Sequence, residues 1–245
     1  MASFLETSNP STQAEYRVGS CFLTDKDKYE QFDPSVCLRR DAAKKNYLLI
    51  GDSHAAQLWY GLSSVFPEAN IMQATASGCK PSLEQNIGAD EKCYRLMHYM
   101  LSDYLPTHPV DTLLIAARWD GRDLSRIPKT IEMVRQQAHE IVLFGSIIQY
   151  DSALPRLLAL SIKQKDPEIP AYHRIAFYQV LDADMEKLAE EQGVRYISYY
   201  KLLCQQGGCQ EYAQKGIPLQ SDYGHLTGIG SMFIATRIRE VAGLP

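Results

Sequence analysis

The sequence predicts an α/β protein, a three-layer α/β/α sandwich built on a mostly parallel sheet of five strands. From residue 46 onward, short apolar runs alternate with longer segments of helical period. Strands that alternate with helices need crossover connections, which make the strands parallel and place helices on both faces of the sheet. The chain of 245 residues is 45% hydrophobic and 22% charged, which is typical of a globular protein and excludes a disordered chain, a coiled coil or a collagen-like fibre.

Five short apolar runs and five longer amphipathic runs define the predicted elements. The strands are predicted at 47–51, 70–74, 112–117, 140–145 and 194–199. The helices are predicted at 55–66, 91–105, 128–137, 171–192 and 227–241, and Pro128 suits the first turn of the third helix. Residues 1–45 are polar and irregular, so we expect a linker and a disulfide-stapled N-terminal extension there, followed by one domain over 46–245.

Charge and residue patterning exclude several partners. Lys and Arg number 25 and Asp and Glu number 29, so the formal net charge is −4. A mildly acidic chain has no sequence-independent attraction for a polyanion, so we expect no nucleic acid partner. The longest apolar runs are far shorter than the ~20 residues that cross a bilayer. No His, Cys, Asp and Glu residues have metal-ligand spacing and no glycine-rich phosphate loop is present, so we expect no metal and no cofactor.

The six cysteines fall into three local pairs, none with the Cys-x-x-Cys spacing of a zinc or redox site. Many connectivities are possible, and we favour pairing by proximity because each pair brackets a loop-like segment. The alternative is free cysteines buried in the core. Disulfides would imply an oxidising compartment. The expected pairs are Cys21 with Cys37, Cys79 with Cys93, and Cys204 with Cys209.

The N-terminus carries no secretory signal. Met1, Ala2 and Ser3 are followed by polar residues, with neither a basic region nor an apolar one. Because the cysteines favour an exported protein, we expect this domain to be a piece of a longer chain whose export element lies upstream.

A candidate nucleophile follows the first predicted strand. Ligands of parallel sheets bind at the carboxyl ends of the strands. Ser53 lies at this edge, where its hydroxyl can project from the sheet and its N–H, near a helix N-terminus, can receive negative charge. The alternative is that Ser53 or Asp52 only caps the helix. The motif is not the Gly-x-Ser-x-Gly elbow of α/β-hydrolases, because Ala55 occupies the last position.

A candidate base for this serine lies near the other end of the chain. Asp222 and His225 precede the last predicted helix, with Gly224 between them to let the chain turn. A serine hydroxyl needs a base, and an imidazole works better when a carboxylate holds its tautomer. Taken alone, this pair could be an Asx turn beside a surface histidine. Together with a strand-end Gly-Asp-Ser at the opposite end of an α/β domain, it indicates a Ser–His–Asp triad.

These motifs carry a family resemblance. Gly-Asp-Ser at 51–53 with Asp-x-x-His at 222–225 resembles the SGNH (GDSL-like) hydrolase superfamily. Four longer strings resemble one subset, the periplasmic SGNH domains fused to multi-spanning membrane acyltransferase-3 proteins that O-acylate bacterial surface glycans. These strings are Gly-Asp-Ser-His-Ala at 51–55, Ser-Gly-Cys-Lys-Pro at 77–81, Ala-Arg-Trp at 117–119 and His-Leu-Thr at 225–227. The resemblance covers about residues 46–245.

The resemblance implies a role for each matching residue. It makes Ser53 the nucleophile, His225 the general base and Asp222 the group that orients the base. It also makes the backbone N–H groups of Ser53 and Gly78 the donors of an oxyanion hole. A glycine after the second strand permits close approach of the backbone to a ligand, although Gly78 can also be an ordinary turn glycine.

One family feature is missing. The superfamily usually places an oxyanion-binding asparagine after the third strand, whereas this chain has no asparagine after Asn86. Arg118 in the corresponding loop can donate to the oxyanion or hold an anionic substrate group, or it can form a surface salt bridge. Trp119 can stack on a sugar ring or pack in the core. His54 is expected to shape the pocket, and His98, His108, His139 and His173 are interpreted as structural.

The resemblance implies serine-dependent transfer of an acyl group, most simply acetyl, to a hydroxyl of a bacterial cell-surface polysaccharide such as an O-antigen. The acyl donor would come from a membrane acyltransferase domain fused upstream, at the periplasmic face of the inner membrane, and the partner would be a glycan acceptor. Two alternatives stay open. The first is a carbohydrate O-acetyl esterase, which uses the same residues with water as acceptor. The second is a non-catalytic glycan-binding domain.

Overall fold

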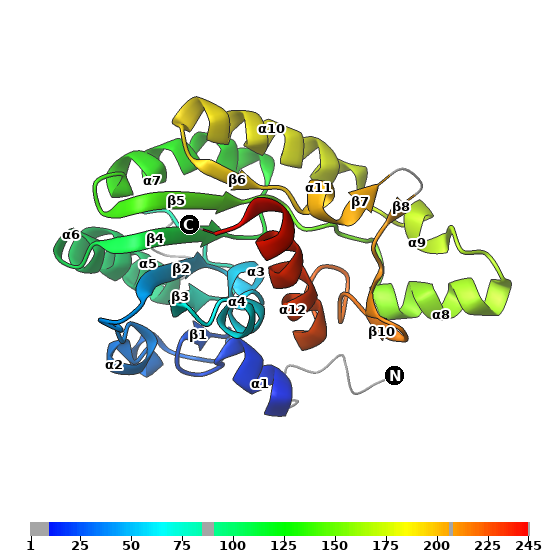
Figure 1. Ribbon diagram of the computed structural model, residues 1–245, viewed down its shortest axis with the longest axis horizontal. Helices are drawn as coiled ribbons and strands as arrows, with labels where there is room; N and C mark the ends of the chain where they lie inside the picture. Colours follow the sequence, from blue (N-terminus) through cyan, green and yellow to red (C-terminus); the bar gives the residue numbers. More distant parts are fainter. Residues whose placement is uncertain (1–9, 85–90, 206–207, 245) are drawn as a thin grey trace.

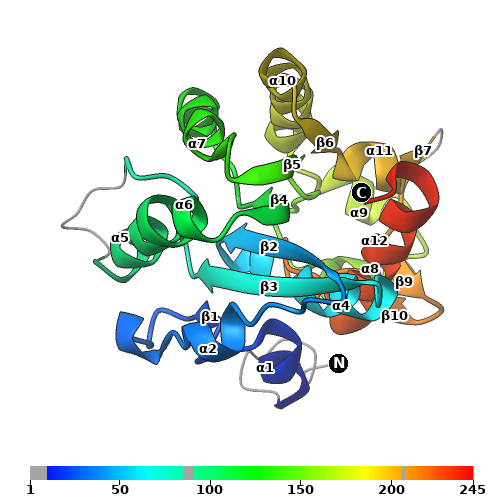
Figure 2. The ribbon, with the colours of Figure 1, turned by 60° about the vertical axis from the view of Figure 1, so that its left-hand side comes forward.

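A six-stranded parallel sheet forms the centre of the molecule (Figures 1 and 2). The computed structural model describes residues 10–84, 91–205 and 208–244. The strand order is β1-β3-β2-β4-β5-β6, and every neighbouring pair is parallel. The predicted α/β sandwich with a parallel sheet is therefore confirmed. The strands are β1 (Phe22–Leu23), β2 (Lys45–Gly51), β3 (Ala69–Ala76), β4 (Val110–Ala116), β5 (Ala138–Phe144) and β6 (Arg195–Ile197).

The sheet has one strand more than the five predicted. Phe22 and Leu23 of the predicted N-terminal extension pair with Thr75 and Ala76 of β3 and extend the sheet at this edge. Two residues with no alternation of apolar and polar side chains give too short a pattern to identify a strand from sequence. The division of the chain at residue 45 stays a prediction, but part of the extension belongs to the central sheet.

Helices cover both faces of the sheet, as crossover connections require. One core lies beneath α5 (Glu91–His98), α7 (Ile127–Val134) and α10 (Ala176–Gln192), against side chains such as Leu48 and Leu113. The opposite core contains alternate strand residues such as Leu49 and Leu114. It is covered by α3 (Ser53–Ala56), α4 (Trp59–Val65), α11 (Tyr199–Leu203) and α12 (Gly228–Arg237).

The remaining elements are short or lie at the periphery. The further helices are α1 (Pro10–Tyr16), α2 (Pro34–Cys37), α6 (Leu105–Thr107), α8 (Leu154–Gln164) and α9 (Ile169–Tyr172). Two small antiparallel hairpins pair β7 (Cys204–Gln205) with β8 (Gly208–Cys209) and β9 (Tyr212–Gln214) with β10 (Ile217–Pro218). Short 3₁₀ helices cover Tyr29–Gln31 and Gly121–Ser125, and π-helical segments cover Tyr99–Tyr104 and Ile238–Ala242.

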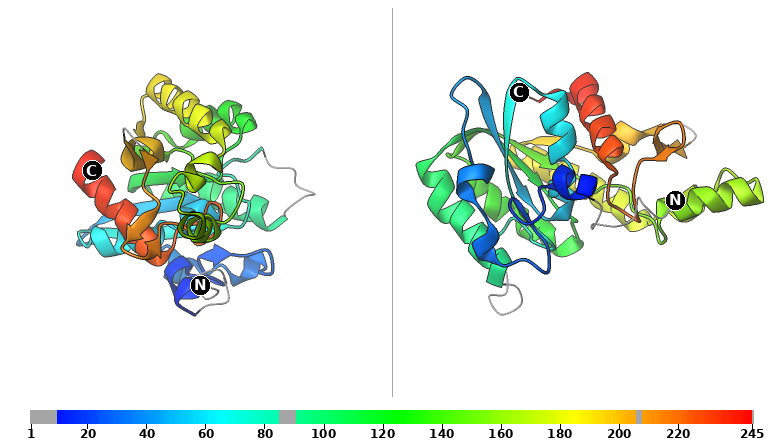
Figure 3. Two further views of the ribbon diagram at one scale, coloured as in Figure 1. Left: turned by 90° about the vertical axis from the view of Figure 1, so that its right-hand side faces the viewer. Right: turned by 90° about the horizontal axis from the view of Figure 1, so that it is seen from below.

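Two predicted helices are shorter or broken for local reasons. The helix predicted at 55–66 divides into α3 and α4, because the N–H of Leu58 bonds the carbonyl of Ala55 and tightens the turn. The helix predicted at 171–192 begins only at Ala176, because Ile175 is extended and its N–H donates to the carbonyl of Gln149. The sequence analysis missed α8, which projects away from the body of the molecule (Figure 3).

Three disulfides join the cysteines in the favoured local pairs, Cys21–Cys37, Cys79–Cys93 and Cys204–Cys209. No helix in the described part of the chain combines the length and apolar character needed to cross a membrane.

The carboxyl ends of β2, β3 and β4 meet at one edge of the sheet. Gly51 at the end of β2 is in register with Thr75 of β3 and Ala116 of β4. A Cβ atom on Gly51 would lie 1.7 Å from the carbonyl oxygen of Ala116, so only glycine fits between these strands. The loops that follow the three strands carry Ser53, Gly78 and Arg118, which places these residues at the same edge.

Candidate active site

Ser53 is the first residue of α3, directly after the end of β2. Asp52 caps this helix, since its Oδ1 accepts a hydrogen bond from the N–H of His54 at 2.8 Å. The capping alternative therefore applies to Asp52, which leaves the hydroxyl of Ser53 for another partner. The Oγ of Ser53 lies 2.9 Å from Nε2 of His225. This contact joins residues 172 positions apart and has the nucleophile–base geometry of acyl transfer.

Asp222 holds the other nitrogen of this imidazole. Its Oδ2 lies 2.7 Å from Nδ1 of His225, while its Oδ1 accepts from the N–H groups of Gly224 and His225. Burial alone would raise the pKa of Asp222, but the hydrogen bond and charge of His225 and the two N–H donors outweigh it and lower this pKa. Asp222 is therefore ionised near neutral pH, as a group that orients an imidazole must be.

The loop that carries these two residues is fixed at several backbone positions. The N–H of Leu154 donates to the carbonyl of Asp222, and the N–H of Tyr150 donates to that of Tyr223. The N–H of Leu226 donates to Oε1 of Gln57 at 2.7 Å. Because Gln57 directly follows α3, this bond ties the loop of the candidate base to the helix of the candidate nucleophile.

Two backbone N–H groups at this edge are available to a ligand. Within the described chain, neither the N–H of Ser53 nor that of Gly78 donates to a protein acceptor. Gly78 has φ +65°, a left-handed conformation that favours glycine, and it lies exposed in a turn closed by the bond from the N–H of Cys79 to the carbonyl of Ala76. These two N–H groups are the donors that the sequence resemblance predicts for an oxyanion hole.

Arg118 is held beside the predicted triad by both its backbone and its side chain. Its N–H donates to Oδ2 of Asp52 at 2.9 Å, a bond that links the ends of β2 and β4. Burial raises the pKa of Asp52, although the charge of Lys80 and the two N–H donors oppose this shift. The backbone N–H of Arg118 is thus already used and is not a third oxyanion donor in this arrangement.

The guanidinium of Arg118 is surrounded by polar and aromatic groups. It donates to Oε1 of Gln149 at 3.2 Å and to the hydroxyls of Tyr223 at 3.2 Å and Tyr178 at 3.4 Å. The guanidinium carbon also lies 5.0 Å from the ring centre of Tyr223. Among the described residues, Arg118 has no carboxylate partner within salt-bridge distance, so the surface salt bridge considered from sequence is not formed.

Trp119 does not face the site. Its side chain is 2% exposed, and its indole N–H donates to the carbonyl of Phe144 at 2.8 Å. Of the two roles left open for Trp119, this burial supports packing in the core and contradicts stacking on a sugar ring. An indole suits both environments, so the sequence could not decide between them.

His54 is buried directly against the candidate base. Its ring centre lies 4.8 Å from that of His225, and only 4% of the residue is exposed. Neither ring nitrogen has a hydrogen-bond partner among the described residues. Burial, with the neighbouring charges of His225, Arg118 and Lys80, lowers the pKa of His54 well below its usual range. His54 therefore packs behind His225 as a neutral side chain, and its ring nitrogens are not exposed to solvent.

A sequence model of the family described as the SGNH domain (fused to AT3 domains) matches residues 20–240. The chain belongs to this family. The SGNH resemblance predicted from the short motifs is thereby confirmed, and the matched region begins within the predicted extension.

Solved structures share the fold of this SGNH domain. The periplasmic domain of a lipopolysaccharide acetyltransferase from Salmonella ser. Paratyphi A superposes with a TM-score of 0.81 at 20% identity, over 97% of this chain and 98% of that chain. A putative acylhydrolase from Bacteroides fragilis NCTC 9343 superposes with a TM-score of 0.51 at 12% identity, over 84% and 90% of the two chains. A comparison with curated proteins found no significant match.

The sequence analysis missed several residues that build this SGNH site. Gln149, Tyr178 and Tyr223 surround Arg118, and Gln57 holds the loop of His225. The sequence positions of two of them could have indicated a place at the site. Gln149 lies in the loop after β5, and Tyr223 lies between Asp222 and His225. No group of His, Cys, Asp and Glu side chains in the described ranges is arranged to hold a metal ion.

Proposed function

We propose that this SGNH domain transfers an acyl group, most simply acetyl, to a hydroxyl of a bacterial cell-surface polysaccharide. The observation that carries the proposal is the continuous chain of contacts from Ser53 Oγ to His225 Nε2 at 2.9 Å and from His225 Nδ1 to Asp222 Oδ2 at 2.7 Å. This arrangement lets an imidazole take the serine proton while a carboxylate stabilises the resulting imidazolium.

The proposed reaction has two halves. In the first, Ser53 attacks the acyl carbonyl, His225 takes the hydroxyl proton, and the N–H groups of Ser53 and Gly78 bind the oxyanion of the tetrahedral intermediate. His225 then gives the proton to the leaving group, and Ser53 remains as an acyl-serine. In the second half, His225 deprotonates the acceptor hydroxyl as its oxygen attacks the acyl carbonyl. The bond between the acyl group and Ser53 then breaks, and His225 returns the proton to Ser53 Oγ.

The family supports an acyl donor that comes from a membrane domain. Members of this family are SGNH domains fused to AT3 domains, and the fold matches the periplasmic domain of a lipopolysaccharide acetyltransferase. We therefore propose that the domain works at the periplasmic face of the inner membrane and receives acyl groups from an AT3 domain of the same protein. The three disulfides are consistent with this oxidising compartment.

The esterase alternative has one structural observation in its favour. Ser53 is only partly buried, so water can reach an acyl group attached to it. The acceptor, and not the triad, would then distinguish an esterase from a transferase.

The proposal is tested with the Ser53→Ala variant. Labelling by a fluorophosphonate and release of p-nitrophenolate from p-nitrophenyl acetate report the first half-reaction. Release of free acetate reports hydrolysis, and mass spectrometry of an added oligosaccharide reports transfer. We expect Ser53→Ala to abolish labelling and to lower acyl transfer by at least about 10³-fold while the fold stays intact. Ser64→Ala, which removes an exposed serine hydroxyl on α4, is the matched control.

Three outcomes separate the alternatives. Acetyl release without glycan acylation would favour the esterase. Glycan binding that Ser53→Ala leaves unchanged, with no fluorophosphonate labelling of the wild type, would favour a non-catalytic module. Equal transfer by wild type and Ser53→Ala would refute the proposed nucleophile.

A further inference from the structure

The N-terminal extension reaches the loop that carries the candidate base. The buried hydroxyl of Tyr16, the last residue of α1, donates to the carbonyl of Leu226 at 3.2 Å. Leu226 directly follows His225, and its N–H is held by Gln57. The peptide groups of Leu226 are therefore held from one side by the segment behind the nucleophile and from the other by the extension, 210 residues away in the sequence.

The neighbour of Tyr16 contacts the same region of the chain. The carboxyl group of Glu15 lies against Gly228, the first residue of α12, where three of its atoms would be within 2.6 Å of any Cβ. Burial raises the pKa of Glu15. Glu15 and Tyr16 thus contact both ends of the short segment 226–228, which connects His225 to α12.

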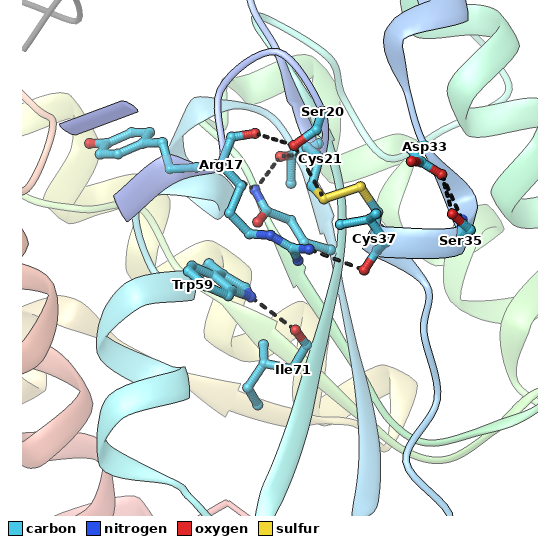
Figure 4. The surroundings of a disulfide bond; sticks show 12 residues. Arg17, Ser20, Cys21, Asp33, Ser35, Cys37, Trp59 and Ile71 are labelled. Atoms are coloured by element: carbon cyan, nitrogen blue, oxygen red, sulfur yellow. Dashed lines mark hydrogen bonds between the residues drawn. A yellow bond between two sulfur atoms is a disulfide. The ribbon is translucent and has the colours of Figure 1, made fainter. Parts of the chain in front are cut away.

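The extension is itself firmly attached, so it can serve as a fixed support (Figure 4). The Cys21–Cys37 disulfide closes it, and the guanidinium of Arg17 lies 4.7 Å from the ring centre of Trp59 on α4 while donating to the carbonyl of Val36. The backbone carbonyl of Tyr16 accepts a hydrogen bond from Nε2 of Gln73 in β3. Figure 1 shows α1 below α4, beside the start of α12.

The extension also reaches the predicted oxyanion side. The carbonyl of Leu23 in β1 accepts a hydrogen bond from the N–H of Ser77 at 2.8 Å. Ser77 directly precedes Gly78, whose N–H is free among the described residues. One segment, residues 15–23, therefore contacts the loops on both sides of Ser53.

We propose that the extension is part of the active site and that Tyr16 is a positioning residue for His225. This inference rests on the proposed function. In it, the Tyr16 hydroxyl fixes the carbonyl of Leu226, so that the imidazole of the preceding residue points at Ser53 Oγ. The Tyr16 hydroxyl bonds the carbonyl of Leu226, so in this proposal it acts on His225 through the backbone of the loop.

The Tyr16→Phe variant removes this hydrogen bond and keeps the ring. Tyr104→Phe is its matched control, because Tyr104 is also buried and its hydroxyl also donates to a backbone carbonyl, that of Leu38, in the core on the other face of the sheet. Labelling by a fluorophosphonate is measured as kinact and KI. Hydrogen exchange at residues 224–227 and thermal unfolding are measured on the same proteins.

We expect Tyr16→Phe to lower kinact by roughly 3–10-fold, the rate equivalent of one lost hydrogen bond, with KI within about twofold of the wild type. The amides of 224–227 should exchange faster in this variant. Tyr104→Phe should keep the wild-type kinact even if it unfolds at a lower temperature.

The outcomes distinguish this inference from the function on which it rests. If wild type is labelled and Ser53→Ala is not, but Tyr16→Phe reacts like wild type, the positioning role is wrong and the proposed nucleophile stands. Equal losses of kinact in Tyr16→Phe and Tyr104→Phe would reduce Tyr16 to a residue of general stability and overturn the inference. If the wild type itself is not labelled, the proposed function is wrong, and the positioning role that rests on it is wrong as well.

Discussion

The loop of His225 and the turn of Gly78 flank the candidate nucleophile, and they are held in different ways. The first is fixed by side chains and backbone groups from distant parts of the chain, among them Gln57 and Tyr16. The second is a glycine turn held by the adjacent Cys79–Cys93 disulfide and by the contact of Ser77 with the extension. The loop of His225, here the base side, is thus held by hydrogen bonds from distant segments, whereas the turn of Gly78, here the oxyanion side, is held by a disulfide and by a hydrogen bond to the extension.

This difference relates to the missing asparagine of the superfamily. The loop after β4 uses the N–H of Arg118 to bind Asp52, and it buries Trp119 in the core. The free protein donors identified near Ser53 are then two backbone N–H groups, those of Ser53 and Gly78. Loss of one oxyanion donor lowers turnover by about 10²–10³-fold in other acyl-transfer enzymes. In the proposed function, an oxyanion hole of two donors would suit a domain that should not release its acyl group to water.

The largest effect is expected on the base side, from Asp222→Asn. An asparagine keeps the shape of the side chain but does not hold the imidazole in the correct tautomer, so we expect fluorophosphonate labelling to slow by about 10⁴-fold. Asp151→Asn is the control, because Asp151 forms a similar 2.7 Å contact with Nδ1 of His173 on the exposed surface. Labelling of Asp222→Asn at the wild-type rate would show that this carboxylate does not orient a base.

A smaller effect is expected on the oxyanion side, from replacing Cys79 and Cys93 by serine. The turn of Gly78 would keep its N–H but lose its covalent support, so we expect kcat to fall by about 10–100-fold, less than for a lost donor. The control replaces Cys204 and Cys209. By loop-closure entropy, the separations of 14 and 5 residues predict losses of about 3 and about 2 kcal/mol in the free energy of unfolding.

The two double variants separate a loss of stability from a change at the site. Both should unfold at a lower urea concentration than the wild type, but only the Cys79–Cys93 pair adjoins the site. If kcat falls equally in both, the Cys79–Cys93 bond has no special role in placing Gly78, and the contrast between the two sides weakens.

The fold and the proposed triad could be predicted because their signals are local. Each of the strands β2 to β5 contains a short, mostly apolar run, and Ser53, Asp222 and His225 lie in short motifs at element ends. Cysteine pairing was also local. β1 has two residues, so only its partner β3 makes it a strand.

The supporting residues could not be predicted, because their contacts join distant parts of the chain. Tyr16 and Gln57 act through single hydrogen bonds to Leu226 across most of the chain, and nothing in their own neighbourhoods marks those contacts. The environment of Trp119 could not be predicted either. An indole N–H finds a hydrogen-bond partner in the core as readily as at a binding site.

The smallest effect concerns His54, which lies behind the base. Because its pKa is lowered in the folded protein, the unfolded chain binds the extra proton first as pH falls. The contribution of neutral His54 to stability is therefore complete above its unfolded pKa of about 6.5 and declines below it, by at most about 1.4 kcal/mol per pH unit, toward the folded pKa. His54→Phe should remove this part of the slope between pH 7.5 and pH 5.

Urea unfolding at several pH values measures the slope, and His139→Phe, at an exposed histidine, is the control. We expect wild type and His139→Phe to lose stability in parallel as pH falls, while His54→Phe loses less. If the stability of His54→Phe falls with pH as steeply as that of the wild type, His54 is not buried as a neutral group. The region behind His225 would then have to be exposed to solvent. The base side would then be less enclosed than its hydrogen bonds indicate, and the contrast with the turn of Gly78 would rest on the loop contacts alone.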